Sequence, residues 1–210
     1  MSRKFKIDRD YHGLGFNIYK KGTFTFNPGV TVLVGCNGIG KTTLLRQVKE
    51  QLKTEKIPVI MFDNLHDGGS NSRIKATFYG DFEFFACSMQ SSEGENIALN
   101  LGAFARKIGD FVRKNDNADE IWILFDAIDS GLSIDAVVDV KEYLFNTIFE
   151  HSHNPEVYIV LSANGYEFAR NEQCFDVLNG RYRKFASYES YRNFILKTRE
   201  EKDKIHENTK

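Results

Sequence analysis

The stretch GCNGIGKTT, residues 35–43, directly follows the apolar run VTVLV and decides the fold. Gly35, Gly40, Lys41 and Thr42 match the spacing of a phosphate-binding loop placed between a strand and a helix. Glycines let successive backbone N–H groups converge on phosphate oxygens, and the start of the helix adds the positive end of its dipole. The lysine can reach the β- and γ-phosphates, and the threonine hydroxyl can bind Mg²⁺. The alternative is a chance glycine-rich turn.

Strand and helix patterns alternate on both sides of this stretch. Residues 22–35 read as two strands around an Asn27-Pro28-Gly29 turn, and the spacing of Leu44, Leu45, Val48 and Leu52 predicts a helix over about 41–53. Further strands are expected at 59–63, 121–125 and 157–161, and further helices at 97–111 and 134–149. Such alternation predicts a mainly parallel sheet in one α/β domain.

Composition bounds the possible classes. At 210 residues, with 41% apolar and 27% charged residues, the chain is long enough for one sizeable core. The formal net charge of −1 gives no bulk attraction to nucleic acid or membranes. Cys36, Cys87 and Cys174 lack metal-site spacing, so neither disulfides nor zinc are expected. No run approaches the roughly 18 apolar residues that span a bilayer, and no secretory signal is recognised. We therefore expect an intracellular, cytoplasmic protein.

A second polar group follows the strand IWILF. Asp126 ends this run, and the carboxyl edge of a parallel sheet is where α/β proteins bind ligands. Paired with the loop, Asp126 is expected to help hold Mg²⁺, together with Thr42; the alternative is an ordinary aspartate that caps the next turn.

The stretch QSSEGE, residues 90–95, stands before the helix expected at 97–111. Ser92 with Glu95 three residues later reads as a capping box, and such a helix start is also an anion site. The loop, this S-x-G-E stretch, the strand that ends in Asp126 and the segment DSGL at 129–132 together resemble an ATP-binding cassette ATPase, over about residues 16–168. Ser92 and Gly94 match the cassette signature, whereas Ser91 and Glu93 depart from it.

The resemblance implies a P-loop NTPase of cassette type, with an N-terminal antiparallel portion and a short helical insertion. We expect one nucleotide-binding domain at 1–196. The mixed-charge composition of residues 197–210 predicts a charged tail that is a frayed helix or disordered. The resemblance also implies a homodimer in the ATP state, in which Ser92 and Gly94 of one subunit bind the γ-phosphate held by the other. Asn64 falls where the family places a metal-contacting glutamine. The nucleotide-binding residues would be Gly35, Cys36, Asn37, Gly38, Ile39, Gly40, Lys41, Thr42, Thr43 and Gly94; the catalytic ones Lys41, Ser92, Asp126 and Asp129; and the Mg²⁺ ligands Thr42, Asp126 and Asn64.

Two positions depart from the family pattern. Ala127 stands where the family has a glutamate that polarises the attacking water, and Ala163 stands where it has a histidine near the γ-phosphate. A methyl group can neither accept a proton nor orient water. Three explanations stay open: an engineered change that traps ATP, a branch that hydrolyses slowly with Asp129, Glu95 or Asn164, or an alignment one residue out.

The leading function is an ATP-binding cassette protein that dimerises on ATP and drives or gates a partner, such as a nuclease or another DNA-processing or defence protein. A nucleotide-gated clamp with negligible turnover and a small-acceptor kinase are the alternatives. Arg181 to Lys184 fit a nucleic-acid patch or, as we prefer, a final strand and turn. Phe16, Tyr19 and Phe24 are candidates for stacking on adenine.

Overall fold

The computed structural model describes residues 1–13, 15, 17–63, 93–130 and 132–207, with the backbone alone for 93–103 and 206. Within these residues, a central sheet has the strand order β4-β5-β6-β3-β7-β8, and a separate antiparallel pair is formed by β1 and β2. The central strands are parallel except for β8, which runs antiparallel to β7. The strands are β1 (Arg3–Lys6), β2 (Thr23–Phe26), β3 (Gly29–Val34), β4 (Val59–Asp63), β5 (Glu120–Asp126), β6 (Glu156–Ser162), β7 (Gln173–Asp176) and β8 (Arg181–Arg183).

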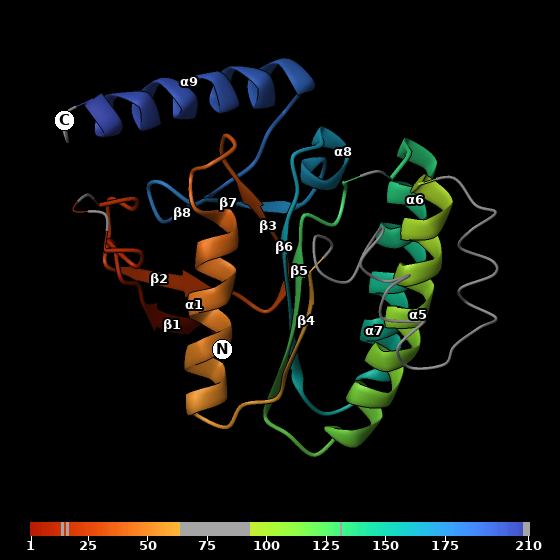
Figure 1. Ribbon diagram of the computed structural model, residues 1–210. Coiled ribbons are helices and arrows are strands. Elements are labelled where there is room, and N and C mark those ends of the chain that lie inside the picture. The colour runs from red at the N-terminus through yellow and green to blue at the C-terminus, as the bar shows by residue number, and fades with distance from the viewer. Residues whose placement is uncertain (14, 16, 64–92, 131, 208–210) are drawn as a thin grey trace.

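The helices cover both faces of the central sheet (Figure 1). Helix α1 and the β1–β2 pair lie on one face, and α5, α6, η1 and α7 lie on the other, while α9 crosses the end of the sheet at which β3 passes into α1. The segment η1 is a π-helical stretch between α6 and α7. The helices are α1 (Lys41–Thr54), α5 (Glu93–Lys114), α6 (Ile134–Asp139), η1 (Val140–Phe145), α7 (Asn146–His151), α8 (Tyr166–Ala169) and α9 (Tyr188–Glu207).

Strand β5 shows why the central strands read as continuous apolar runs. Ile121, Ile123 and Phe125 point into the core beneath α5 and α7, whereas Trp122 and Leu124 point into the core beneath α1. All five side chains are fully buried. Because successive side chains of a strand face opposite sides, a strand covered on both faces needs apolar residues throughout.

Aromatic packing joins the β1–β2 pair to the central sheet. The Trp122 ring stacks on Tyr158 of β6 with centroids 4.1 Å apart, and the rings of Phe5 and Phe26 meet Trp122 edge to face. The edge-to-face arrangement matches the quadrupoles of the rings. The small antiparallel pair is thus part of the same hydrophobic core as α1.

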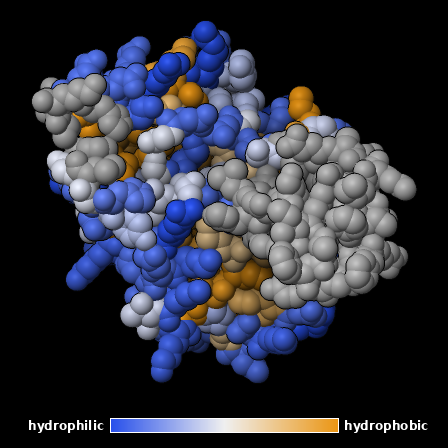
Figure 2. Space-filling view, in the orientation of Figure 1, coloured by the Kyte–Doolittle hydropathy of each residue, from blue (hydrophilic) through white to orange (hydrophobic). Residues whose placement is uncertain are grey.

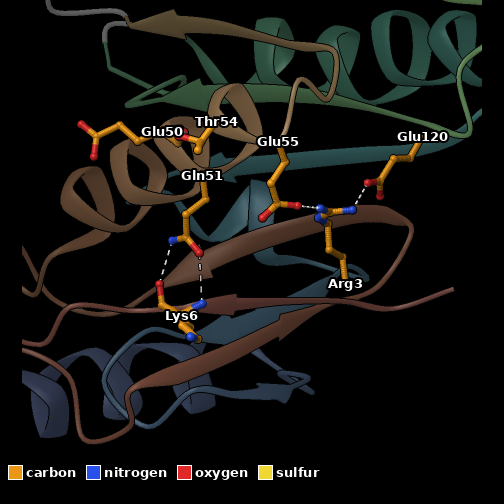
Figure 3. A network of polar contacts seen from close by, with 7 residues as sticks. All are labelled: Arg3, Lys6, Glu50, Gln51, Thr54, Glu55 and Glu120. Atoms are coloured by element: carbon orange, nitrogen blue, oxygen red, sulfur yellow. Dashed lines mark hydrogen bonds and ion pairs between the residues drawn. The ribbon is translucent and has the colours of Figure 1, made fainter.

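Polar contacts also attach β1 to α1 (Figure 3). The Gln51 side chain accepts from the backbone N–H of Lys6 at 3.1 Å and donates to its carbonyl at 2.7 Å. Arg3 pairs with Glu55, next to the end of α1, and with Glu120 at the start of β5. The amide of Gln51 therefore takes the place of a neighbouring strand along the edge of β1.

Most of the elements expected from the sequence are confirmed. The strands at 59–63, 121–125 and 157–161 are β4, β5 and β6, and the helix expected at 134–149 is present with the π-helical segment in its middle. Arg181 to Arg183 form β8, and the Tyr182 ring packs on Phe175, which confirms the strand interpretation of this segment. The short helical insertion falls at 64–92, outside the described residues.

Two alternatives were expected for the tail, a frayed helix or disorder. The structure shows a helix, since residues 197–207 continue α9 without a break. The physical reason is that this part of the helix contacts the rest of the chain: Thr198 is 2% exposed, and Lys20 pairs with Glu201. The division into a domain at 1–196 and a tail at 197–210 stays a prediction.

The surface in the same orientation is mainly hydrophilic along its upper part, where α9 lies (Figure 2). Within the described part of the chain, every helix is too short or too polar to cross a membrane.

Candidate functional site

The loop between β3 and α1 has the backbone geometry that its glycines predict. Gly35, Gly38 and Gly40 have φ values of 148°, 76° and 97°, a region that side chains disfavour. Space is a second constraint at Gly40, where a Cβ would lie 2.8 Å from Ile18 Cγ2 and 2.9 Å from Tyr19 Oη. Only glycine fits at Gly40, so the loop can turn directly into the first residue of α1.

Lys41 begins α1 and folds back over the loop. Its Nζ donates to Gly35 O at 2.7 Å and to Cys36 O at 3.3 Å, and the residue is only 9% exposed. Burial lowers the pKa of the ammonium group, and the carboxylates of Asp129 and Asp126 act in the opposite direction. A buried ammonium group whose hydrogen bonds among the described residues go to two loop carbonyls is suited to receive an anion.

Asp126 ends β5 and meets the loop across the end of β6. Its Oδ1 accepts hydrogen bonds from Thr42 Oγ1 at 3.0 Å and from Ser162 Oγ at 2.5 Å. Its Oδ2 is buried and has no hydrogen-bond partner among the described residues. Ser162 Oγ also accepts from the backbone N–H of Ala127 at 2.8 Å. The sheet order places β6 between β3 and β5, so Ser162 lies where it can connect the two predicted site segments.

A cavity of about 400 Å³ joins these groups. Eight of the predicted site residues line it: Asn37, Gly38, Ile39, Gly40, Lys41, Thr42, Thr43 and Asp126. Gly35 and Cys36 are not among the lining residues but supply the carbonyls that hold Lys41. The structure therefore brings together the loop and the acid that the sequence analysis paired.

Five further residues that line the cavity were not assigned to the site from the sequence: His12, Ile18, Ser162, Lys202 and Ile205. His12 Nε2 lies 3.2 Å from Thr43 Oγ1. These residues come from segments far apart in the chain, and no local motif marks them. For Ser162, the one available signal was its place at the end of a buried strand next to the strand of Asp126.

Asp129 takes a different position from Asp126. Its Oδ2 accepts from the backbone N–H groups of Asn164, at 2.6 Å, and of Gly165. These contacts hold the segment between β6 and α8. Asp129 does not line the cavity in the described residues, and its catalytic role stays a prediction.

The two alanines that depart from the family pattern lie in different surroundings. Ala127 lines the cavity, with φ at 51° in the left-handed region. Ala163 is 2% exposed and packs in the core beneath α5 and α7, whereas its neighbour Asn164 lines the cavity. Of the two residues that follow Ser162, Asn164 lines the cavity and Ala163 does not.

Two of the three candidates for stacking on adenine are excluded. Tyr19 is 0% exposed and its hydroxyl donates to Gly40 O at 2.8 Å, and Phe24 is 1% exposed against Phe175. Buried rings of the core cannot also stack on a ligand. The third candidate, Phe16, lies outside the described residues.

Other predicted site residues remain untested. Asn64 and Ser92 lie outside the described residues. Gly94 falls in the first turn of α5, which begins at Glu93.

Comparison with known families agrees with this geometry. A family described as "AAA domain" matches residues 24–125, slightly less than half of the chain. No curated protein matches the chain. The matched segment includes the loop and β5 up to Phe125, one residue before Asp126, and the mainly parallel sheet is flanked by helices. The fold is that of an α/β P-loop NTPase, and the match indicates nucleotide binding.

Proposed function

We propose that residues 35–43 bind the phosphates of ATP together with Mg²⁺, and that the chain is an ATPase of the ATP-binding cassette type. The observation that carries the proposal is the environment of Asp126. One carboxylate oxygen is held by the hydroxyls of Thr42 and Ser162, and the other is buried without a partner among the described residues. A buried unpartnered carboxylate oxygen is costly in free energy. A cation beside Thr42 would remove this cost.

The residues present fit Mg²⁺. Hydroxyl and carboxylate oxygens are the hard ligands that this ion prefers, and Thr42 and Asp126 would hold it. When bound, Mg²⁺ would neutralise charge on the β- and γ-phosphates. Asn64 is proposed as a further contributor from outside the described residues.

The chain's own groups would bind and orient the nucleotide. The glycine-rich backbone and the start of α1 offer N–H groups to phosphate oxygens, and Lys41 adds a positive charge on the same wall. Ser162 orients both the Asp126 carboxylate and the backbone at Ala127. Because Ala127 has no proton acceptor, we propose that hydrolysis is slow.

A second candidate function is a nucleotide-gated clamp with negligible hydrolysis. The observation that favours it is the Ala127 methyl group on the cavity wall beside Asp126, where the family resemblance implies a catalytic glutamate. Phosphate release by the unaltered chain separates the two candidates.

We further propose that ATP drives homodimerisation, with Ser92 and Gly94 of one subunit contacting the nucleotide of the other. The cycle would drive or gate a partner protein, such as a nuclease or another DNA-processing or defence protein. Support comes from the cassette-like motifs and from the start of α5 at Glu93, within the signature-like stretch 90–95.

Asp126→Asn tests the Mg²⁺ site. The amide keeps the shape of the side chain and can accept from Thr42 and Ser162, but it removes the charge. We expect Mg²⁺ to strengthen ATP binding by the unaltered chain, relative to ATP with a chelator, and the variant to lose roughly tenfold or more of this gain. Calorimetric titration of both proteins in both buffers measures the effect.

Asp110→Asn is the matched control, because Asp110 is an exposed acid on α5 that pairs with Arg113. It should keep the full Mg²⁺ dependence. An Asp126→Asn variant that also keeps it would remove Asp126 from the metal site.

A further inference from the structure

Helix α9 lies across the loop between β3 and α1 (Figure 1) and contacts the backbone of two consecutive loop residues. The backbone N–H of Cys36 donates to Thr198 Oγ1 at 3.1 Å, and Lys202 Nζ donates to Asn37 O at 3.2 Å. Thr198 and Lys202 are four residues apart, so they lie on the same face of the helix. Specific polar contacts therefore hold this face of α9 against the loop.

Lys202 lines the same cavity as the predicted phosphate loop. Its Nζ lies 3.7 Å from the position that a Cβ on Gly38 would occupy. Asn37, Asn164 and Lys202 also line a neighbouring cavity of about 450 Å³ beneath α9, so these three residues stand between the two cavities. Asn164 lies two residues after Ser162, the residue that donates to Asp126. Lys202 therefore lines the same cavity as the segment that positions Asp126.

Two ammonium groups share three consecutive carbonyls of the loop. Lys41 donates to Gly35 O and Cys36 O, and Lys202 donates to Asn37 O. The carboxylate of Asp203 lies 3.8 Å from Lys202 Nζ, but its side chain is 55% exposed, so solvent weakens the pair. Two cations gathered on one short stretch of backbone repel each other, and an anion between them would offset this repulsion.

We propose that Lys202 binds the terminal phosphate of a nucleoside triphosphate, so that the site distinguishes a triphosphate from a diphosphate. The inference rests on the proposed function: a nucleotide whose phosphates lie along residues 35–43 would bring its terminal phosphate into the cavity that Lys202 also lines. Ala163 faces the core and offers no charge here. Lys202 supplies a cation to this region from the opposite end of the chain.

Lys202→Met tests the inference, because it keeps an unbranched apolar side chain and removes the charge. Titrations with MgATP and MgADP give the ratio of the two dissociation constants. We expect the unaltered chain to prefer ATP and the variant to lose roughly tenfold in ATP affinity, with ADP affinity changed less than about twofold. Lys202→Arg should retain the preference. Lys204→Met, an exposed lysine on the same helix with the same change in charge, should match the unaltered chain.

The outcomes separate this inference from the proposed function. If the unaltered chain binds neither nucleotide, the proposed function fails and the inference with it. If the unaltered chain binds ATP and Lys202→Met keeps the same ratio, the inference alone is overturned. An equal loss for ATP and ADP also overturns it, since Lys202 would then only position the loop. Lys202→Gln provides the same reading if the methionine variant does not fold.

Discussion

The two walls of the cavity differ in how the chain builds them. One wall is the continuous segment 37–43, shaped by glycines and by the start of α1. The other gathers His12, Ser162, Asn164 and Lys202 from three separate parts of the chain. The first wall depends on local backbone geometry, whereas the second exists only when the sheet, the segment after β6 and α9 are packed together. The difference shows that the loop could be recognised from a motif, while its surroundings could not.

The largest effect is expected at Ala127, which lines the cavity. Ala127→Glu places a proton acceptor on the cavity wall next to Asp126, and we expect phosphate release to rise by about 10²-fold or more, within the range of general-base catalysis. The gain is expected to be smaller if a group near the γ-phosphate also limits the step. Steady-state phosphate release by the unaltered chain and the variant measures it.

Ala127→Gln is the matched control, because it has the size of glutamate without its basicity, and Lys41→Ala serves as the blank. Equal rates for the glutamate and glutamine variants would show that the carboxylate is not acting as a base. Brisk hydrolysis by the unaltered chain would assign the role to another residue, such as Asp129 or Glu95, and the alignment at Ala127 would be wrong.

A smaller effect is expected on the mass of the protein in solution, which should double with MgATP if a second copy of the chain completes the site. We expect light scattering to show a monomer without nucleotide and a dimer with MgATP. Ser92→Arg should prevent the dimer, because a large cation at the signature-like stretch would not fit against the other subunit. The size of the unaltered chain with MgADP is the control. A chain that stays monomeric with MgATP at high concentration would contradict the cassette mechanism.

Much of the fold was predictable because its signals are local. The run IWILF predicts a strand buried on both faces, and the structure confirms five fully buried side chains there. The spacing of Leu44, Leu45, Val48 and Leu52 predicts α1, and all four are buried. The glycine-rich loop and Asp126 each follow a strand of the parallel sheet at its carboxyl end. The sequence therefore predicts that they lie at the same edge of the sheet.

The rest of the site depends on contacts between distant segments. A charge-rich end such as KTREEKDK has a composition typical of a solvated tail, yet Thr198 and Lys202 contact the loop through tertiary packing. Tyr19 and Phe24 were both candidates for stacking on a base, but both rings are buried. Phe24 packs on Phe175, and the Tyr19 hydroxyl donates to Gly40 O. Composition and periodicity carry no record of such contacts.

The decisive measurement is a calorimetric titration of the unaltered chain and of Lys41→Ala with MgATP. Lys41 donates to two loop carbonyls and lines the cavity, so the variant should lose measurable binding. Its fold should remain, with a loss of stability on the order of 1–2 kcal/mol from the two hydrogen bonds. Lys53→Ala, an exposed lysine in the last turn of the same helix, controls for charge. We expect saturable binding by the unaltered chain and by Lys53→Ala, and none by folded Lys41→Ala. Equal affinity in all three proteins would show that residues 35–43 do not hold the nucleotide.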